Sequence, residues 1–355
     1  MRKSIGAVTA CRRVFCVVAS VVLLTAAGPA AAEDEIGGTQ RIHAAATDSA
    51  PLTDNSQALG IRPATERVQT TPTVIDQAIA ALKLNARQEC AQWEDRTFDE
   101  FEKSTFREPF AHGKYIVSGD IAIPDREQLR EFFESHIKGQ PAEAEPGALI
   151  VHRVEGRDAI WDSNKKRLLT YCVSTRFGAR YERVISDMRA AANAWEMAAD
   201  VDFIHARSED ANCTARNMNV VFDIRPINVN GQYLARAFFP KDLRPERNIL
   251  IDESAFELDP DGSLQLVGII RHELGHTLGW RHEHTRPESG ACFEDNNWRP
   301  LTDYDDLSVM HYPQCNGGGD WSLTLTDMDR NGAACVYGPA PGFEIDPQIC
   351  RAVES

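Results

Sequence analysis

The sequence predicts an α+β fold in which a twisted mixed sheet packs against long helices and a loop-rich region follows. Candidate strands lie at 148–154, 168–175, 219–224 and 248–252. After the second of these, residues 180–198 have the apolar spacing of a long amphipathic helix that packs on a sheet. A second helix is expected after residue 263, and from residue 283 onward the chain is expected to be rich in loops.

The N-terminus has the features of a secretory signal peptide. Basic residues at positions 2, 3, 12 and 13 precede an apolar stretch at 14–27, and Ala30–Ala32 suits cleavage before Glu33. The apolar stretch is shorter than the roughly 20 residues of a membrane span, and we find no later run of that kind. We therefore expect residues 1–32 to be removed and the protein to be secreted or periplasmic.

Between this signal and residue 148, the sequence predicts a flexible leader followed by a small folded unit. Residues 33–72 are rich in Ala, Thr, Pro and polar side chains and show little periodicity. The features that follow are, in order, helical patterning at 74–103, a strand at 114–123 that is broken at 118–120, a helix through Ile137 that is capped by Asp125, and a linker at 139–147.

The remaining elements follow from apolar spacing and from capping residues. The long helix has apolar side chains at Val184, Ile185, Met188, Ala192 and Trp195. A turn at 259–262 precedes Ser263, which is placed to cap the second helix. We expect a late helix near 326–337.

The run from His272 to His282 predicts a catalytic metal site. His272 and His276 are four residues apart, so both imidazoles leave the same face of a helix. Gly279 permits a left-handed turn that brings His282 back as a third ligand. Three neutral imidazoles are typical of a zinc site that leaves a fourth position for water. Glu273 lies beside the same helix face, where its carboxylate can hold that water and accept a proton.

This long form of the motif resembles the metzincin clan of zinc endopeptidases. The pentapeptide at 308–312, Ser-Val-Met-His-Tyr, also resembles the Met-turn of that clan, in which Met310 would pack beneath the metal. The resemblance implies a metzincin fold, with the sheet and long helices in an upper subdomain, a loop-rich lower subdomain and one catalytic Zn²⁺. The alternatives are an ordinary amphipathic helix at the histidines and simple core packing of Met310.

The residues after the third histidine resemble the astacin family within that clan. Glu283 follows His282 directly, residues 284–287 continue the similarity, and the Ser-x-Met-His-Tyr turn agrees with it. The resemblance implies that Tyr312 stabilises the oxyanion by donating a hydrogen bond, and that Glu283 binds the freed amino terminus. A structural tyrosine and a surface carboxylate are the alternatives.

Part of the upstream sequence resembles the matrixins instead. Residues 234–240 and 248–252 are similar to the pair of matrixin strands before the active-site helix. In metzincins an antiparallel edge strand there binds extended substrate by strand addition. The calcium and second-zinc ligands of true matrixins are not evident, so we expect an astacin-like protein of bacterial type with matrixin-like strands.

The cysteines indicate an oxidising compartment. Of nine, two lie in the signal and Cys90 lies in the leader region. The six that remain are Cys172, Cys213, Cys292, Cys315, Cys335 and Cys350, which permit many pairings. We expect Cys292–Cys315 to close a loop around the Met-turn and Cys335–Cys350 to fix the tail.

The charge balance argues against nucleic acid or an anionic membrane as a partner. The net charge is −15, and residues 158–355 contain 20 basic against 31 acidic residues, a balance of −11. We expect protein or peptide substrates, and no membrane span once the signal is removed. The sequence does not indicate an oligomeric state.

The N-terminal region predicts a latent precursor. Cys90 lacks the Pro-Arg-Cys-Gly context by which matrixin prosegments block zinc, whereas residues 117–121 resemble the astacin segment that uses an aspartate. The resemblance implies that Asp120 takes the open zinc position, and a simple glycine-aspartate turn is the alternative. We assign residues 33–157 to leader and prosegment and residues 158–355 to the catalytic domain, with cleavage near Arg153 or Arg157.

The sequence therefore predicts a secreted zinc-dependent endopeptidase, with His272, His276 and His282 as ligands and Glu273 as general base. His284 and His311 each lie beside a position with an assigned role, so neither is expected to be a ligand. A gluzincin, whose third ligand is a downstream glutamate, is disfavoured by the Gly279/His282 pair and the Met-turn. A silent zinc-binding or adhesion module is disfavoured by the intact Glu273.

Overall fold

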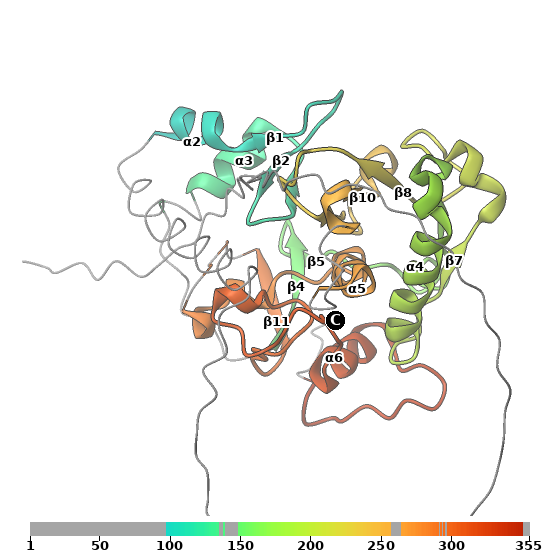
Figure 1. Ribbon diagram of the computed structural model, residues 1–355. Helices are drawn as coiled ribbons and strands as arrows, with labels where there is room; N and C mark the ends of the chain where they lie inside the picture. The colour runs from blue at the N-terminus through green and yellow to red at the C-terminus, as the bar shows by residue number, and fades with distance from the viewer. Residues whose placement is uncertain are drawn as a thin grey trace, which may run out of the picture.

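The structure, a computed structural model, describes residues 97–134, 138, 148–256, 264–290, 292, 294 and 297–350 (Figure 1). These residues form a small N-terminal unit, two further sheets and three longer helices. Several sequence predictions lie outside the described residues: the signal peptide, the leader, Cys90, most of the helix at 74–103, the linker and Ser263.

The N-terminal unit is a short sheet packed against two helices. Its elements are α2 (Phe98–Ser104), β1 (Phe106–Arg107), β2 (Tyr115–Val117), β3 (Ile121–Ile123) and α3 (Arg126–Phe132). The three strands pair antiparallel, so the segment predicted as a broken strand is a hairpin. Asp125 caps α3 as predicted, since its carboxylate accepts a hydrogen bond from the Gln128 amide at 2.9 Å. Apolar side chains of these elements form a core of their own.

The main sheet is mixed, as predicted. Its strands run in the order β7-β6-β8-β10-β9, and their bounds are β6 (Leu169–Val173), β7 (Phe203–His205), β8 (Phe222–Ile227), β9 (Ala235–Arg236) and β10 (Asn248–Asp252). β9 pairs antiparallel with β10, while the other neighbours are parallel. Within the described part of the chain, β9 is the last strand on its side of the sheet.

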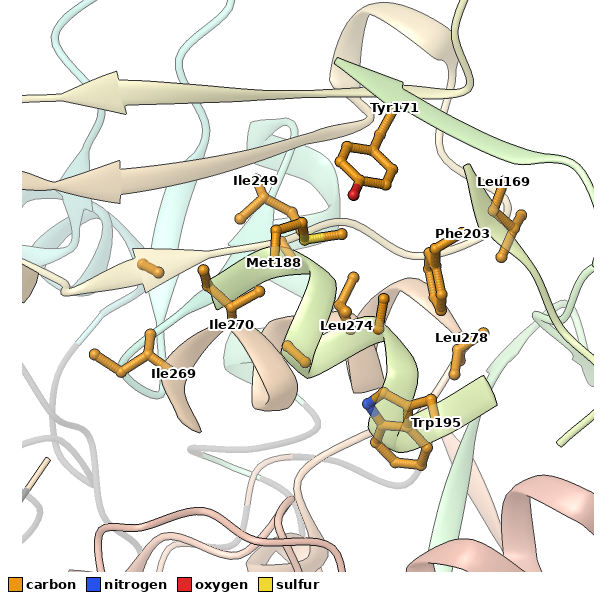
Figure 2. Packing of buried hydrophobic residues seen from close by; sticks show 14 of the residues in the cluster. Leu169, Tyr171, Met188, Trp195, Phe203, Ile249, Ile269, Ile270, Leu274 and Leu278 are labelled. Carbon is orange, nitrogen blue, oxygen red and sulfur yellow. The ribbon is translucent and has the colours of Figure 1, made fainter. Parts of the chain in front are cut away.

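Two long helices pack on this sheet and on each other. They are α4 (Tyr181–Glu196), at the position expected for the amphipathic helix, and α5 (Leu266–Thr277), which carries the first two histidines. Figure 2 shows Met188 and Trp195 of α4 facing Leu274 of α5 in one apolar layer near the strands. Trp195 is fully buried, and its indole N–H donates to the carbonyl of Arg271 at 3.0 Å.

A second sheet joins two distant segments of the chain. β4 (Ala148–Val154) lies between β5 (Arg157–Asp158) and β11 (Trp298–Thr302), and both pairs are antiparallel. Leu149 and Val151 of β4 pack into the same core as the main sheet and the two long helices. The domain boundary after residue 157 stays a prediction, but the core around the histidine helix reaches back to Leu149.

The structure corrects some element boundaries. β8 begins at Phe222 rather than at 219, because Arg244 donates hydrogen bonds to the carbonyls of Asn217 and Val220 and engages that backbone. α5 begins at Leu266 with Gln265 as its N-cap, so Ser263 lies too far upstream to cap it. The late helix is confirmed as α6 (Asp327–Tyr337), which is capped by Thr326.

Three disulfides link parts of the fold, and both predicted pairs are confirmed. They are Cys172–Cys213, Cys292–Cys315 and Cys335–Cys350. Cys292–Cys315 closes the loop around the Met-turn, as expected. Across the residues that the structure describes, no helix combines the length and the apolar character needed to cross a bilayer.

Replacing Trp195 with Ala is expected to lower the free energy of unfolding by about 3–5 kcal/mol, because the indole would leave a cavity between α4 and α5. Guanidinium chloride titration followed by circular dichroism measures the loss. Met197→Ala is the matched control: this side chain near the end of the same helix is 67% exposed, and its loss should cost less than about 0.5 kcal/mol. Equal losses in both variants would contradict this account of the packing.

Candidate metal centre

α5 carries His272, Glu273 and His276 into the interior of the protein. Each of these residues is 2% exposed. Two hydrogen bonds from other segments hold the end of the helix. The Trp161 indole donates to the Thr277 carbonyl at 2.8 Å, and the Tyr337 hydroxyl donates to the Leu278 carbonyl at 2.6 Å. The helix therefore stops at a fixed point one residue after His276.

Gly279 then turns the chain toward His282. Its φ is +101°, in the region that favours glycine. A Cβ atom at this position would also collide with the carbonyl oxygen of Ala159. The left-handed turn expected from the sequence is therefore present, and it returns a fully buried His282 to the two histidines of the helix.

The three imidazoles direct their Nε2 atoms toward one another. Each Nδ1 atom faces an oxygen acceptor at 2.5–2.7 Å: the Val309 carbonyl for His272, the Trp280 carbonyl for His276 and the Glu294 carboxylate for His282. In a neutral ring the proton therefore belongs on Nδ1, and the Nε2 lone pair stays free. The three lone pairs consequently converge.

This arrangement fits a zinc ion. Nε2 of His282 lies 3.2 Å from Nε2 of His272 and 3.2 Å from Nε2 of His276. Two nitrogens bound to one tetrahedral zinc at about 2.0–2.1 Å would be about 3.3 Å apart. Among the described residues, one buried oxygen of Asp120 and one of Glu273 have no hydrogen-bond partner. Three converging lone pairs with a carboxylate between them form a donor set for a divalent cation.

The β2–β3 hairpin places Asp120 at the point where the histidines converge. Its Oδ1 lies 3.0 Å from Nε2 of His282, and its Oδ2 lies 3.3 Å and 3.8 Å from Nε2 of His272 and His276. The structure thus brings the residue expected to maintain latency together with all three expected ligands.

Tyr312 lies against the same cluster. Its ring centroid is 5.4 Å from that of His272 and 4.6 Å from that of His282, and its hydroxyl donates to Asp120 Oδ2 at 2.6 Å. Gly119 has a φ of +93°, and a Cβ there would lie 3.1 Å from the Tyr312 hydroxyl. The glycine before Asp120 is therefore needed both for the turn and for close approach to the phenol.

Met310 is fully buried beneath α5, as the Met-turn resemblance implies. A Cβ atom at Gly275 would overlap its sulfur, so this glycine permits the close packing. Asp329 of α6 holds the turn from below: it accepts hydrogen bonds from the Ser308 hydroxyl at 2.6 Å and from the Val309 amide at 2.9 Å. Asp329 therefore fixes the carbonyl that faces the first histidine, a role that the sequence analysis missed.

Glu294 is a second site residue that the sequence analysis missed. It is fully buried; one oxygen faces Nδ1 of His282, and the other accepts from Arg281 Nη2 at 2.7 Å. Burial alone would raise the pKa of Glu294, but His282 and Arg281 hold it well below its usual range. The only sequence signal for Glu294 was its place two residues after Cys292, in the loop that the Cys292–Cys315 disulfide closes.

Burial shifts the pKa values of two residues on α5, Glu273 and His276. It raises the pKa of Glu273 well above its usual range, the Asp120 carboxylate adds to the rise, and His282 and Arg236 oppose it. It lowers the pKa of His276 to about 4, so this imidazole is neutral and can donate a lone pair to a metal. A carboxylate with a raised pKa suits proton exchange near neutral pH.

Glu283 lies outside the Nε2 cluster. It is fully buried; its Oε1 lies 3.3 Å from Arg286 Nη1 and accepts from the Asp305 amide, while its Oε2 has no partner among the described residues. Binding of an amino terminus by Glu283 stays a prediction. His284 and His311 also lie off the Nε2 cluster, where burial lowers their pKa values to about 3 and about 4.

Histidines on a buried helix, a methionine turn beneath them and a mixed sheet with an antiparallel edge are the features of a metzincin-type zinc site. A sequence model of the family described as Matrixin matches residues 160–289, which include all three histidines. The Zinc metalloproteinase nas-30 of Caenorhabditis elegans is 33% identical over 82 residues, which cover 18% of this chain and 11% of that protein. These matches support a metzincin-type zinc metallopeptidase, with zinc as its metal.

Glu294→Gln is expected to weaken zinc binding by about 10–100-fold, because the neutral amide orients His282 less firmly and binds Arg281 Nη2 less strongly than the carboxylate does. Competition with a chromophoric chelator on full-length protein measures the affinity. Glu182→Gln removes an acidic side chain that is 68% exposed on α4, and it should leave the affinity unchanged. An affinity in Glu294→Gln equal to that of wild type would refute the orienting role.

Proposed function

We propose that this protein is an exported, zinc-dependent endopeptidase that is made as a latent precursor. The observation that carries the proposal is the convergence of three Nε2 atoms beside a buried glutamate, with a carboxylate of the N-terminal unit among them. His272, His276 and His282 would hold the zinc, and Asp120 would occupy the remaining position in the latent form.

Glu273 is the proposed general base. Zinc, when bound, supplies a Lewis acid that acidifies a water molecule and polarises the scissile carbonyl. Glu273 follows His272 on α5, and its unpartnered buried oxygen is available to accept the proton of the attacking water and pass it to the leaving amine. Its raised pKa brings this exchange closer to neutral pH than for an exposed glutamate.

Tyr312 is the proposed donor to the oxyanion. Its hydroxyl donates to Asp120 in the structure, so the same hydroxyl becomes available once Asp120 leaves. Burial, together with the Asp120 carboxylate, raises the pKa of Tyr312 well above its usual range, which keeps the phenol protonated. A protonated phenol beside the histidines can donate to developing negative charge.

Protein or peptide chains are the proposed substrates, bound in extended form along β9. An antiparallel edge strand offers backbone groups for strand addition. We assign the protein to an astacin-like subtype within the metzincins, on the basis of Glu283 and the form of the Met-turn. The match to the Matrixin family supports the matrixin-like character of the strands before α5.

Activation by cleavage near Arg153 or Arg157 is proposed from the shape of the β4–β5 hairpin. Its turn contains Glu155 and Gly156, both exposed and both with positive φ, and exposed turns are preferred sites of proteolysis. Removing everything before residue 158 would also remove β4 from its pairing with β11. N-terminal sequencing of active protein locates the cut, and the three disulfides fit the proposed export.

Two other functions are less well supported. A gluzincin needs a downstream glutamate as third ligand, whereas His282 directs its Nε2 to the other two histidines. A catalytically silent zinc-binding module does not need a general base, whereas Glu273 is buried beside the cluster and its Oε2 has no hydrogen-bond partner among the described residues. Both observations favour the peptidase.

The proposed activity predicts hydrolysis of quenched fluorescent peptides that requires both zinc and Glu273. Glu273→Ala and treatment with o-phenanthroline should each reduce the rate by at least about 100-fold, because one removes the base and the other the metal. Full-length protein is assayed before and after limited proteolysis near residue 157. Zinc bound at full occupancy with no hydrolysis in any form would instead favour the binding module.

Removing the Asp120 carboxylate is expected to raise the activity of the uncleaved chain by about tenfold or more, since water regains access to the zinc. The variant is Asp120→Ala, measured by hydrolysis of the same peptides. Asp125→Ala is the matched control, because it removes a carboxylate that only caps α3 in the same N-terminal unit. An uncleaved Asp120→Ala chain as inactive as wild type would rule out the aspartate switch.

A further inference from the structure

A second carboxylate of the N-terminal unit is held deep within the part of the chain that carries the histidines. Glu108 follows β1 and is 3% exposed, and its partner Arg236, on β9, is 2% exposed. The two side chains form a bidentate ion pair: Arg236 Nε lies 2.7 Å from Glu108 Oε1, and Nη2 lies 2.9 Å from Oε2. The planar guanidinium fork matches the two carboxylate oxygens in this geometry.

The cradle around this carboxylate is built mainly by residues after position 148. The Tyr233 hydroxyl donates to Glu108 Oε1 at 2.7 Å, alongside the two bonds from Arg236. Only the Lys114 amide, which donates to Oε2 at 3.0 Å, belongs to the N-terminal unit itself. Asn248 of β10 accepts from Arg236 Nη1 at 2.6 Å, so a residue outside the N-terminal unit also orients the guanidinium.

The position of the cradle connects it with substrate binding. Arg236 belongs to the edge strand along which we expect extended substrate to bind. The next residues, 237–239, line one pocket together with residues 120–122 of the N-terminal unit. The N-terminal unit therefore lies along the proposed substrate-binding strand, β9. It places the Asp120 carboxylate at the histidines and the Glu108 carboxylate at Arg236.

We propose that Arg236 and Tyr233 form a subsite for an acidic side chain of the substrate, which Glu108 fills in the latent protein. The proposal rests on the proposed peptidase function and adds a preference for substrates with Glu or Asp at one position. When Glu108 withdraws, Nε and Nη2 of Arg236 lose the hydrogen-bond partners that they have among the described residues, and a substrate carboxylate restores both bonds.

The recognition is local, because the overall charge would not select an acidic substrate. Residues 158–355 carry a net charge of −11, so long-range electrostatic repulsion opposes the approach of an acidic peptide. A second ion pair, between Lys114 and Asp242 at 3.2 Å, also joins the N-terminal unit to the rest of the chain. Here the N-terminal unit supplies the cation, so its withdrawal would leave no positive charge to bind a substrate carboxylate. The expected preference therefore depends on the single guanidinium of Arg236.

The test uses zinc-loaded full-length protein in which both carboxylates have been neutralised by Asp120→Ala and Glu108→Gln. Paired fluorogenic peptides differ only in Glu against Gln, scanned over each position. At one position the Glu peptide is expected to have a kcat/KM about tenfold higher or more, with the difference in KM. Adding Arg236→Gln should abolish this difference, whereas Arg207→Gln, which removes a cation that pairs with Glu182 at the surface, should preserve it.

Equal rates for Glu and Gln at every position, or a Glu preference that survives Arg236→Gln, would overturn the proposal. Should Glu108→Gln fail to fold, Glu108→Asp withdraws the carboxylate while keeping the charge, and the scan is run on that variant. If no peptide is cut by any variant, before or after limited proteolysis near residue 157, the proposed peptidase function fails. The affinity of the same paired peptides, measured by fluorescence anisotropy, then tests the acidic subsite separately. Tighter binding of the Glu peptide that is lost in Arg236→Gln supports the subsite, and equal affinities for the Glu and Gln peptides refute it.

Discussion

The fixed orientation of three imidazoles is the constraint on which the rest of the structure depends. Each ring must keep its proton on Nδ1 so that Nε2 faces inward, and each Nδ1 therefore needs a fixed acceptor. The acceptors come from three separate segments: the turn after α5, the Met-turn and the loop that carries Glu294. The site exists only when all three segments are correctly folded around one helix.

Each of these segments is fixed by a different interaction. The turn after α5 is set by the positive φ of Gly279, the Met-turn is held by Asp329 of α6, and the Glu294 loop is closed by Cys292–Cys315. Met310 then packs against α5 at Gly275 and excludes water from beneath the histidines. The loop-rich lower half thus orients ligands that the helix alone would leave free to rotate.

What the sequence predicted is what local spacing determines. Helical periodicity placed α4, the four-residue spacing placed His272 and His276 on one face, and Gly279 indicated the turn to His282. Glu294 could not be found this way, because its role depends on a loop folding back onto a ring twelve residues away. The pairing of β4 with β11 is equally non-local, so the core's extension back to Leu149 was not expected.

The proposed latency and the proposed catalysis would place opposing demands on the same groups. In the proposed mechanism a substrate needs the Tyr312 hydroxyl, the open side of the histidine cluster and the β9 edge. The N-terminal unit engages the first two through Asp120 and the third through Glu108. Gly119 allows the β2–β3 hairpin to approach the Tyr312 phenol closely, which the proposed inhibitory contact requires. Withdrawal of the β2–β3 hairpin would therefore leave in place the Nδ1 acceptors, none of which belongs to it, and such preorganisation is what electrostatic stabilisation of a transition state needs.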